Sequence, residues 1–306
     1  MPETLRLGTR TSRLAMWQAE HVVSRLSAAW PDLDVELVPF VTKGDTTLDK
    51  PLPEIGGKGL FTAELEASLL DGRIDLAVHS LKDLPTEDPE GVTVGAILER
   101  ADPRDAWICP GDHSLDDLPE AAVVGTSSPR RAAQLLRLRP DLTVRSIRGN
   151  VPTRIEKVRS GSYDASVLAV AGLARLGRMD EATATLSFGT MLPAPGQGAV
   201  AVQIRADDGR VQRLVSALDH GPTRRAVEAE RHLLAALGGG CSAPVAALAT
   251  EADGDLRLRG RVLATDGSVC IEIDERAPLD TEAVALRLGE VAAASALAQG
   301  ARDLLP

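Results

Sequence analysis

The chain has 306 residues, a net charge of −10 at pH 7, 44% hydrophobic residues and 25% charged residues. This length allows two or three domains with well-buried cores, and the composition is ordinary for a globular protein. The acidic balance and the 2% of aromatic residues argue against a nucleic-acid-binding protein, because single-strand binders need stacking aromatics and duplex binders are usually basic.

The chain also lacks the common signals for membranes, secretion and metal binding. No apolar run approaches the length of a membrane span, and the first residues have no signal-peptide core. Three cysteines (Cys109, Cys241 and Cys270) without a secretory signal suggest free thiols, so we expect a cytoplasmic protein. We also expect a monomer, for which the sequence itself gives no signal. The five histidines are scattered, with no His-x-x-x-His or Cys-x-x-Cys pair, so we expect no metal.

Strand signals alternate with helical patterns through the first two thirds of the chain. They fall at residues 5–9, 35–41, 75–78, 92–97, 123–126, 144–147 and 166–170. This alternation predicts two α/β lobes with largely parallel sheets, and paired lobes of this kind bind ligands in the cleft between them. The strand-like segment at 198–205 follows the second lobe, and we expect it to return to the first sheet.

A weak internal repeat supports two related lobes. Residues 7–15 (Leu-Gly-Thr-Arg-Thr-Ser-Arg-Leu-Ala) align with 124–132 (Val-Gly-Thr-Ser-Ser-Pro-Arg-Arg-Ala), and 72–78 align with 161–167. The two separations, 117 and 89 residues, differ, so the pattern indicates shared architecture rather than a tandem copy. A chance match between short blocks is the alternative interpretation.

The pattern changes after residue 221 to that of a smaller α+β domain. A helix at 223–237 is stopped by three glycines, three short strands follow at 245–249, 256–263 and 269–273, and an Ala/Leu-rich helix starts at Thr281. We therefore predict lobe 1 (residues 1–98 and 194–218), lobe 2 (99–193) and a C-terminal domain (219–306).

An arginine-rich segment at 127–159 is the clearest functional signal. It holds eight arginines and Lys157 against two acidic residues, a local charge of +7 in an acidic protein. Arg130 and Arg131 open a helix after a strand, and Arg148 precedes the next helix, where free N–H groups already favour anions. Arginine binds carboxylate or phosphate in bidentate fashion, so we predict a ligand with several negative charges. Arg137 and Arg139 fit an exposed helix face instead.

Three further segments are candidates for chemistry. Cys241 follows three glycines, which suits an accessible thiol for covalent attachment, whereas Cys109 and Cys270 are interpreted as small buried residues. Ser80, Lys82 and Asp83 follow a strand; Asp83 is either a turn residue or a carboxylate that stabilises positive charge and moves protons. The Gly/Pro-rich loop carrying Lys58 suits either a mobile lid or a plain surface loop.

Eight ordered motifs resemble those of the porphobilinogen deaminase (hydroxymethylbilane synthase) family, from about residue 5 to 275. They begin at Gly8 (Gly-Thr-Arg-Thr-Ser-Arg-Leu-Ala), Gly56 (Gly-Gly-Lys-Gly-Leu-Phe), Val78 (Val-His-Ser-Leu-Lys-Asp-Leu-Pro), Gly125 (Gly-Thr-Ser-Ser-Pro-Arg-Arg), Ser146 (Ser-Ile-Arg-Gly-Asn-Val-Pro-Thr-Arg), Leu168 (Leu-Ala-Val-Ala-Gly-Leu-Ala-Arg-Leu-Gly), Pro195 (Pro-Gly-Gln-Gly-Ala) and Gly238 (Gly-Gly-Gly-Cys-Ser-Ala-Pro). Any one motif alone is weak, but the ordered set is specific.

The resemblance implies two type II periplasmic-binding-protein-like lobes, a third domain, and a dipyrromethane cofactor joined to Cys241 by a thioether. It implies an enzyme that deaminates four porphobilinogen molecules and joins them head to tail into hydroxymethylbilane. Asp83 matches the catalytic aspartate that stabilises the azafulvene cation. Positions implied to bind cofactor or substrate are Arg10, Ser12, Lys58, Ser80, Lys82, Thr126, Ser127, Ser128, Arg130, Arg131, Arg148, Gly149, Arg154, Arg175 and Gln197.

Two departures from the family pattern and one rival interpretation accompany this resemblance. Glu54 stands where many relatives have Lys, which removes a basic contact from the loop, and Pro129 replaces a usual Leu at a position compatible with a first helical turn.

A non-catalytic anion-binding or sensor protein with the same two lobes would explain the arginines and the repeat. It would not explain Cys241 together with Asp83, or the third domain.

Overall fold

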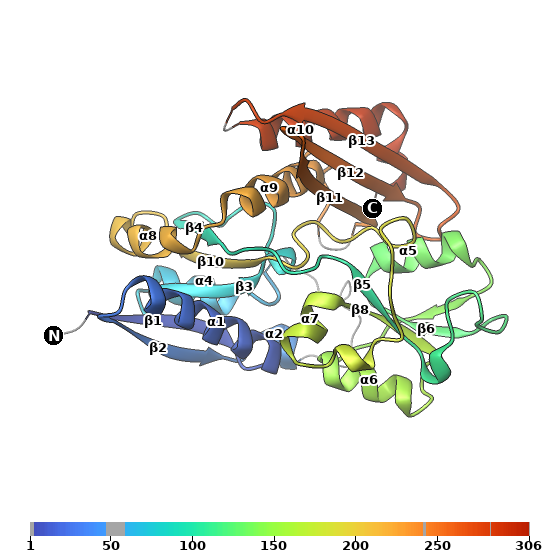
Figure 1. The fold of residues 1–306 in the computed structure, drawn as a ribbon, viewed down its shortest axis with the longest axis horizontal. Helices are drawn as coiled ribbons and strands as arrows, with labels where there is room; N and C mark the ends of the chain where they lie inside the picture. The colour runs from blue at the N-terminus through green and yellow to red at the C-terminus, as the bar shows by residue number, and fades with distance from the viewer. Residues whose placement is uncertain (1–2, 47–58, 241–242, 282, 306) are drawn as a thin grey trace. The chain divides into compact units, whose positions relative to one another are not determined.

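The computed structural model describes residues 3–46, 59–240, 243–281 and 283–305 (Figure 1). Three positions singled out from the sequence, Glu54, Lys58 and Cys241, lie outside the described residues. The described chain forms two compact units. The first comprises residues 3–46, 59–101 and 199–224, and the second comprises residues 102–198 and the described part of 225–305.

The first unit contains a five-stranded sheet in the order β2-β1-β3-β10-β4. Its strands are β1 (Glu3–Arg10), β2 (Leu33–Phe40), β3 (Leu76–Ser80), β4 (Val92–Ile97) and β10 (Val200–Arg205). Strand β1 runs parallel to β2 and β3, whereas β10 runs antiparallel to β3 and β4. The expected return of residues 198–205 to this sheet is confirmed. The other four strands run in one direction, as the expectation of a largely parallel sheet requires, and only β10 runs against them, so the sheet is mixed. Strand β10 follows β9 of the other unit in the chain, without the crossover helix that would align it with β3.

Helices cover both faces of this sheet. They are α1 (Arg13–Ala29), α2 (Lys43–Thr46), α4 (Ala63–Leu70) and α8 (Gly209–Val215), with short 3-10 turns η1 (Leu81–Asp83) and η4 (Ser216–Leu218). Helices α1 and α8 pack on the face that carries Leu76 and Val78. Helix α4 packs Leu65 and Leu69 against Ala77 on the opposite face. Because side chains alternate along β3, His79 lies on the α4 side with Ala77.

The second unit contains a sheet with the equivalent order, β7-β6-β8-β5-β9. Its strands are β5 (Asp105–Ile108), β6 (Val123–Gly125), β7 (Thr143–Arg145), β8 (Ala165–Ala169) and β9 (Ala184–Thr185), and its helices are α5 (Pro129–Leu138), α6 (Val151–Arg159) and α7 (Val170–Arg175), with short 3-10 turns η2 (Pro110–Asp112) and η3 (Met179–Glu181). Strand β5 runs antiparallel to β8 and β9, so this sheet is mixed as well. Strands β5 and β9 have no counterpart among the predicted strands.

The two sheets confirm the repeat seen in the sequence. The first pair of aligned blocks covers the ends of β1 and β6 and the helices that follow them, α1 and α5. The second pair covers β3 and β8. Ser12 and Ser128 play the same local role, because each accepts a hydrogen bond from a backbone N–H three residues later as the N-cap of its helix. The two sheets share one strand order, as expected of two related α/β lobes.

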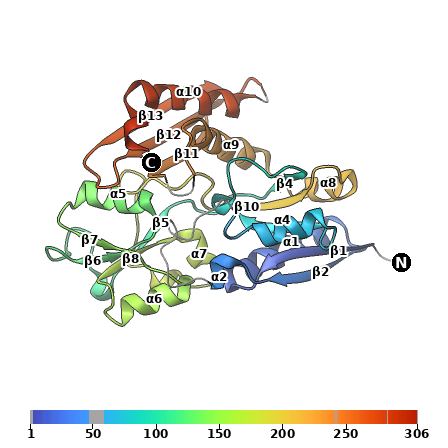
Figure 2. The same cartoon turned by 180° about the vertical axis from the view of Figure 1, so that it is seen from behind.

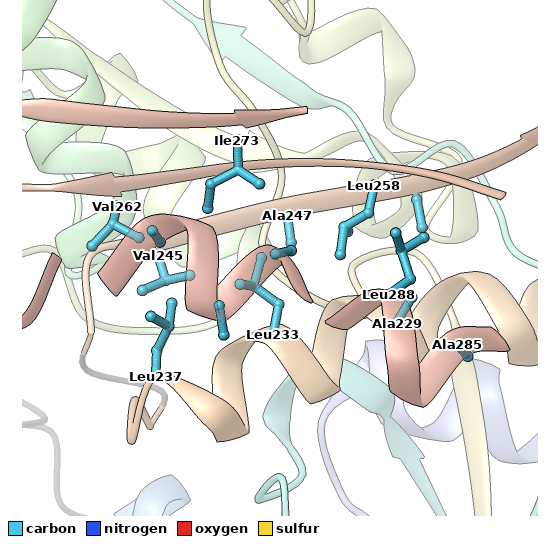
Figure 3. Packing of buried hydrophobic residues seen from close by; sticks show 14 of the residues in the cluster. Ala229, Leu233, Leu237, Val245, Ala247, Leu258, Val262, Ile273, Ala285 and Leu288 are labelled. Atoms are coloured by element: carbon cyan, nitrogen blue, oxygen red, sulfur yellow. The ribbon is translucent and has the colours of Figure 1, made fainter. Parts of the chain in front are cut away.

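A three-stranded antiparallel sheet, β11-β12-β13, forms the C-terminal part of the second unit (Figure 2). Its elements are α9 (Gly221–Ala236), β11 (Val245–Ala252), β12 (Asp255–Leu263), β13 (Cys270–Pro278), α10 (Val284–Ala298) and the short 3-10 turn η5 (Ala301–Leu304). Leu233 of α9 and Leu288 of α10 pack with Leu258 and Val262 of β12 in one apolar cluster (Figure 3). This is the α+β domain expected from the sequence. No described helix is long and apolar enough to cross a membrane.

Gly289 sets the close approach of α9 and α10. A Cβ placed there would lie 2.5 Å from the Cβ of His232 and 2.9 Å from the carbonyl oxygen of Ala229. We predict that Gly289→Ala lowers the free energy of unfolding by about 1–3 kcal/mol, because rigid helix backbone must move to admit the methyl group. Chemical denaturation measures this value.

Gly209→Ala in α8 is the matched control, since the nearest atom to its added Cβ is 3.9 Å away. It should change stability little or raise it slightly, because alanine favours helix over glycine. Equal losses in both variants would contradict the close-packing explanation.

Candidate functional site

Residues from β1, α1 and η1 meet at one edge of the first sheet. Strands β1 and β3 are parallel neighbours, so their carboxyl ends, at Arg10 and Ser80, lie at the same edge. Arg10, Ser12, Ser80 and Asp83 line one cavity of about 60 Å³, called here the site cavity. The sequence placed these four residues among the candidates, and the structure brings them together. Lys82, between Ser80 and Asp83, is half-buried and is not part of the cavity wall.

Two contacts hold the walls of the site cavity. The buried amide of Gln18 in α1 donates to the Ser80 hydroxyl at 2.8 Å. The Arg10 guanidinium lies over the Phe61 ring, 4.3 Å from its centroid, as in a cation–π contact. Asp83 itself is exposed. An exposed carboxylate beside a fixed hydroxyl and a guanidinium can approach a ligand that carries both N–H groups and carboxylates.

His79 also lines this cavity, and the sequence analysis did not select it. Burial, helped by the positive charge of Arg10, lowers the pKa of His79 to about 3. The imidazole therefore stays neutral near pH 7 and does not serve as a cationic acid there. Its place in the strand pattern Ala-Val-His-Ser was a usable signal, because alternation puts it on the same face as Ala77.

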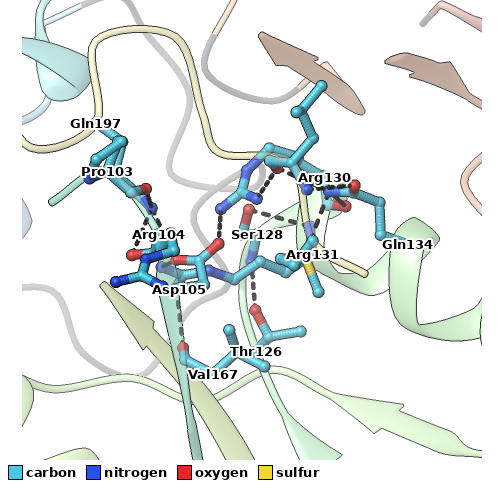
Figure 4. Close-up of polar contacts among 12 residues, drawn as sticks. Pro103, Arg104, Asp105, Thr126, Ser128, Arg130, Arg131, Gln134, Val167 and Gln197 are labelled. Atoms are coloured by element: carbon cyan, nitrogen blue, oxygen red, sulfur yellow. Dashed lines mark hydrogen bonds and ion pairs between the residues drawn. The ribbon is translucent and has the colours of Figure 1, made fainter. Parts of the chain in front are cut away.

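Arg130 and Arg131 form the centre of the candidate site in the second unit (Figure 4). Both lie in the first turn of α5 and are 3% and 6% exposed. Asp105, which is fully buried at the start of β5, accepts from the Nη2 atoms of both, at 2.8 and 2.6 Å. The sequence analysis missed Asp105, although an acidic residue before Ala-Trp-Ile in an arginine-rich lobe was a possible signal.

Further contacts fix the two guanidiniums in place. Nη1 of Arg130 donates to the Leu192 carbonyl at 2.6 Å, and Nη1 of Arg131 donates to the Val167 carbonyl at 2.9 Å. The Gln197 amide, also buried, donates to Asp105 at 2.8 Å. Burial lowers the pKa of Arg130, and the Asp105 charge opposes that effect. Two cations share one carboxylate, so one positive charge remains uncompensated within this group.

The Nε atoms of Arg130 and Arg131 are buried and have no hydrogen-bond partner among the described residues. The prediction that these arginines follow a strand and open a helix is correct. Their part in ligand binding stays a prediction, and it now has a definite geometry. A ligand carboxylate would meet guanidiniums that the protein already holds in one orientation.

The remaining candidates of this unit lie at the ends of β6 and β7 and near α7. Thr126 Oγ1 accepts from Ser128 N–H at 3.2 Å, and the Ser127 hydroxyl donates to the Ile147 carbonyl at 2.8 Å. Both contacts order the loop after β6. Arg175, in the last turn of α7, donates to the Gly198 carbonyl at 2.7 Å, and burial lowers its pKa to about 10.

Arg148, Gly149 and Arg154 form one turn before and into α6. Nε of Arg154 donates to the Gly149 carbonyl at 2.8 Å, and Asn150 caps the helix by accepting from Thr153 N–H at 3.0 Å. Gly149 has a φ of +110°, and a Cβ there would lie 2.7 Å from Thr153 Cγ2, so this position requires glycine. The turn fixes the backbone positions from which the partly buried side chains of Arg148 and Arg154 extend.

Two further arginines and two cysteines can be compared with what the sequence predicted for them. Arg137 is exposed, as expected of a solvated helix face. Arg139 is partly buried and pairs with Asp141 at 2.7 Å. Cys109 is buried as expected, whereas Cys270 is only partly buried, and burial raises the pKa of its thiol.

Two family models match the chain over most of its length. Residues 5–213 match "Porphobilinogen deaminase, dipyromethane cofactor binding domain". Residues 224–297 match "Porphobilinogen deaminase, C-terminal domain". The matched ranges include both groups of candidate residues.

The chain is also similar to solved structures at low sequence identity. One is the sulfate-bound regulatory domain of an OxyR2 mutant from Vibrio vulnificus, at 16% identity and a TM-score of 0.43, covering 70% of this chain and 94% of that one. Another is the probable amino-acid ABC transporter extracellular-binding protein ytmK from Bacillus subtilis, at 11% identity and a TM-score of 0.41, covering 71% and 91%.

The Asp105 group makes a stability prediction. We expect Asp105→Asn to lower the free energy of unfolding by about 3–5 kcal/mol, because it leaves two buried guanidiniums without their carboxylate. Urea denaturation monitored by circular dichroism measures the loss.

Asp141→Asn is the control, since its pair with Arg139 is partly exposed and solvent screening leaves it a much smaller contribution to stability. If Asp105→Asn were as stable as Asp141→Asn, the buried pairing would not hold the arginines as described.

Proposed function

The chain belongs to the porphobilinogen deaminase family, and from that membership we propose that Asp83 is its catalytic carboxylate. The activity is that of a hydroxymethylbilane synthase of tetrapyrrole biosynthesis, which condenses four porphobilinogen molecules head to tail with loss of ammonia. The observation that supports Asp83 most directly is its position. It lines the site cavity together with Arg10 and Ser12, at the carboxyl ends of two parallel strands.

The chemistry of the substrate fits these side chains. Porphobilinogen carries an acetate, a propionate, a pyrrole N–H and an aminomethyl group. When the aminomethyl C–N bond breaks, positive charge develops on the methylene and the pyrrole ring. The Asp83 carboxylate opposes that charge and accepts the pyrrole N–H, while the Arg10 guanidinium binds a side-chain carboxylate.

We assign the dipyrromethane cofactor to the same residues. Asp83 suits the pyrrole N–H groups, and the hydroxyls of Ser12 and Ser80 with the guanidinium of Arg10 suit carboxylates. When bound, this group supplies the pyrrole carbon to which the first substrate unit is joined. Its attachment through a thioether to Cys241 is a proposal from the family resemblance, and Lys58 is proposed as a further contact. Both residues lie outside the described residues.

The second unit is proposed to neutralise the carboxylates of the growing product. The candidates are the hydroxyl and glycine positions Thr126, Ser127, Ser128 and Gly149, the cations Arg130, Arg131, Arg148, Arg154 and Arg175, the amide of Gln197, and Lys82 of the first unit. Each added pyrrole brings two carboxylates, so the product gains negative charge at every step. The one uncompensated charge at Asp105, Arg130 and Arg131 favours such an anion.

We also propose a division into three domains, with boundaries at residues 98, 193 and 218. We further propose that the protein is monomeric and cytoplasmic and binds no nucleic acid. Free thiols at Cys109 and Cys270 support a reducing compartment. The net charge of −10 supports the absence of a nucleic-acid partner.

Replacing Asp83 tests its catalytic role. We expect Asp83→Asn to bind porphobilinogen but to turn over more slowly by several powers of ten, a rise in barrier of about 4 kcal/mol or more. The substitution keeps the shape of the side chain and removes its charge. Colorimetric measurement of porphobilinogen consumption gives the rate.

Glu90→Gln is the matched control, because Glu90 is exposed in the segment between η1 and β4 and lines neither the site cavity nor the larger cavity beside that segment. It should retain the wild-type rate. Near-normal turnover by folded Asp83→Asn would remove Asp83 from the catalytic role.

The attachment at Cys241 makes a separate prediction. The purified wild type should be heavier than its sequence by two pyrrole units, and the extra mass should survive denaturation because a thioether is covalent. Cys241→Ala should be folded, inactive and of sequence mass, whereas Cys109→Ala and Cys270→Ala should keep the adduct. Intact-protein mass spectrometry measures the mass of the wild type and of the three variants. An adduct that persisted in Cys241→Ala would place the attachment elsewhere.

A further inference from the structure

Four buried side chains of the first unit carry polar atoms that lack a hydrogen-bond partner within the described ranges. These side chains are Thr62, Glu66, His79 and Gln203, called here the polar row, and the atoms are Thr62 Oγ1, Glu66 Oε1, His79 Nε2 and both amide atoms of Gln203. Their exposed fractions are 1%, 8%, 5% and 0%. Each buried polar atom left without a partner costs about 1–3 kcal/mol, so a row of them calls for a functional explanation.

The four side chains lie together on the α4 face of the first sheet. Gln203 of β10 pairs directly with Ala77 of β3, so Gln203 and His79 are diagonal neighbours on one face. Glu66 comes from α4, which covers that face, and Thr62 precedes α4 without using its hydroxyl as a cap. Thr62 and Gln203 lie near enough to Glu66 to lower its pKa by weak hydrogen bonding, and Gln203 raises the pKa of His79 in the same way. None of these contacts has the distance and angle of a well-formed hydrogen bond.

Members of the polar row line two cavities. Thr62 and His79 line the site cavity, together with Asp83. Glu66 lines a second cavity of about 310 Å³, called here the acidic cavity, whose other walls are Gly59, Pro85, Glu87, Asp88 and Pro89. Three carboxylates around one cavity repel the anionic substrate and attract a cation. Leu65 and Leu69 of α4 are packed against the same face of the sheet, so a cation bound beside the row must be small.

The polar atoms of the row suit a cation that donates hydrogen bonds. Thr62 Oγ1, Glu66 Oε1 and Gln203 Oε1 are acceptors, and neutral His79 accepts at Nε2 when its other ring nitrogen carries the proton. Burial raises the pKa of the Glu66 carboxyl, and the negative charge of Asp88 adds to that effect. A cation beside Glu66 would restore its charged form.

We propose that the polar row and the acidic cavity form a binding site and exit path for the ammonium ion released at each condensation, a proposal that rests on the proposed function. In that step the C–N bond of the protonated aminomethyl group breaks, and its electron pair leaves with nitrogen as ammonia. A pyrrole carbon then attacks the methylene, and the proton lost from that carbon converts the ammonia into ammonium. Atoms and charge balance without another reactant. The site takes this ion away from Asp83, where a retained cation would compete with the next substrate.

Inhibition by added ammonium tests the proposal. Initial rates of wild type and Glu66→Gln are measured with ammonium chloride and, at equal ionic strength, with tetramethylammonium chloride, which donates no hydrogen bond. We expect ammonium to inhibit the wild type and tetramethylammonium to have no effect. Glu66→Gln should require about tenfold or more ammonium for the same inhibition, the ratio expected for a lost hydrogen bond to a charged group. Equal ammonium sensitivity in the two proteins, or no ammonium inhibition of the wild type, would overturn the proposal.

Crystals soaked in thallium(I), a monovalent ion close in size to ammonium, give a readout that does not depend on turnover. An anomalous peak among Glu66, Gln203 and His79 in the wild type, lost in Glu66→Gln, is the expected result, and absence of a peak in the wild type would contradict it. Glu90→Gln is the control and should keep wild-type ammonium sensitivity and the peak. Turnover without added ammonium tests the enzyme activity separately, so failure of the ammonium site and failure of the function are distinguishable.

Discussion

The ion pairs of Asp105 with Arg130 and Arg131 fix the position of two positive charges in the second unit. The carboxylate is fully buried, and it binds one Nη atom of each guanidinium. The same guanidiniums reach carbonyls of Leu192 and Val167, so strands β5 and β8, helix α5 and the segment before β10 are joined through one charged group. Holding flexible arginines in this way reduces the entropy that a ligand carboxylate would otherwise have to overcome.

The two units present side chains of opposite charge. The first presents an exposed carboxylate, Asp83, in a small cavity, and we propose that it faces the positive charge that develops on the substrate. The second presents buried guanidiniums, and we propose that they balance the carboxylates of a lengthening product. Both use the same geometric device, since functional side chains follow the carboxyl ends of strands in related sheets. Ser12 and Ser128 show this likeness at single residues, because each caps the helix that begins a few residues after such a strand, although the aligned blocks place Ser128 opposite Thr11.

Much of this architecture could be predicted from local patterns, and the failures have physical causes. Strand β4 was predicted at its observed bounds, because a short apolar run between turn residues is a strong signal. Strand β5 was missed, since its four residues begin with a charged one and only its pairing with β8 and β9 defines it. The same limit applies to the sites. Asp83 and the arginines carry local motif signals, whereas Asp105 and Gln203 gain meaning only when distant segments pack together.

This chain is a deaminating enzyme rather than a protein that only binds anions. The most direct test is to incubate the purified protein with porphobilinogen and to measure substrate, ammonia and linear tetrapyrrole in one sample. We expect one ammonia for each porphobilinogen consumed, and four porphobilinogen molecules used for each hydroxymethylbilane released. A folded protein that binds porphobilinogen but releases no ammonia would contradict this expectation.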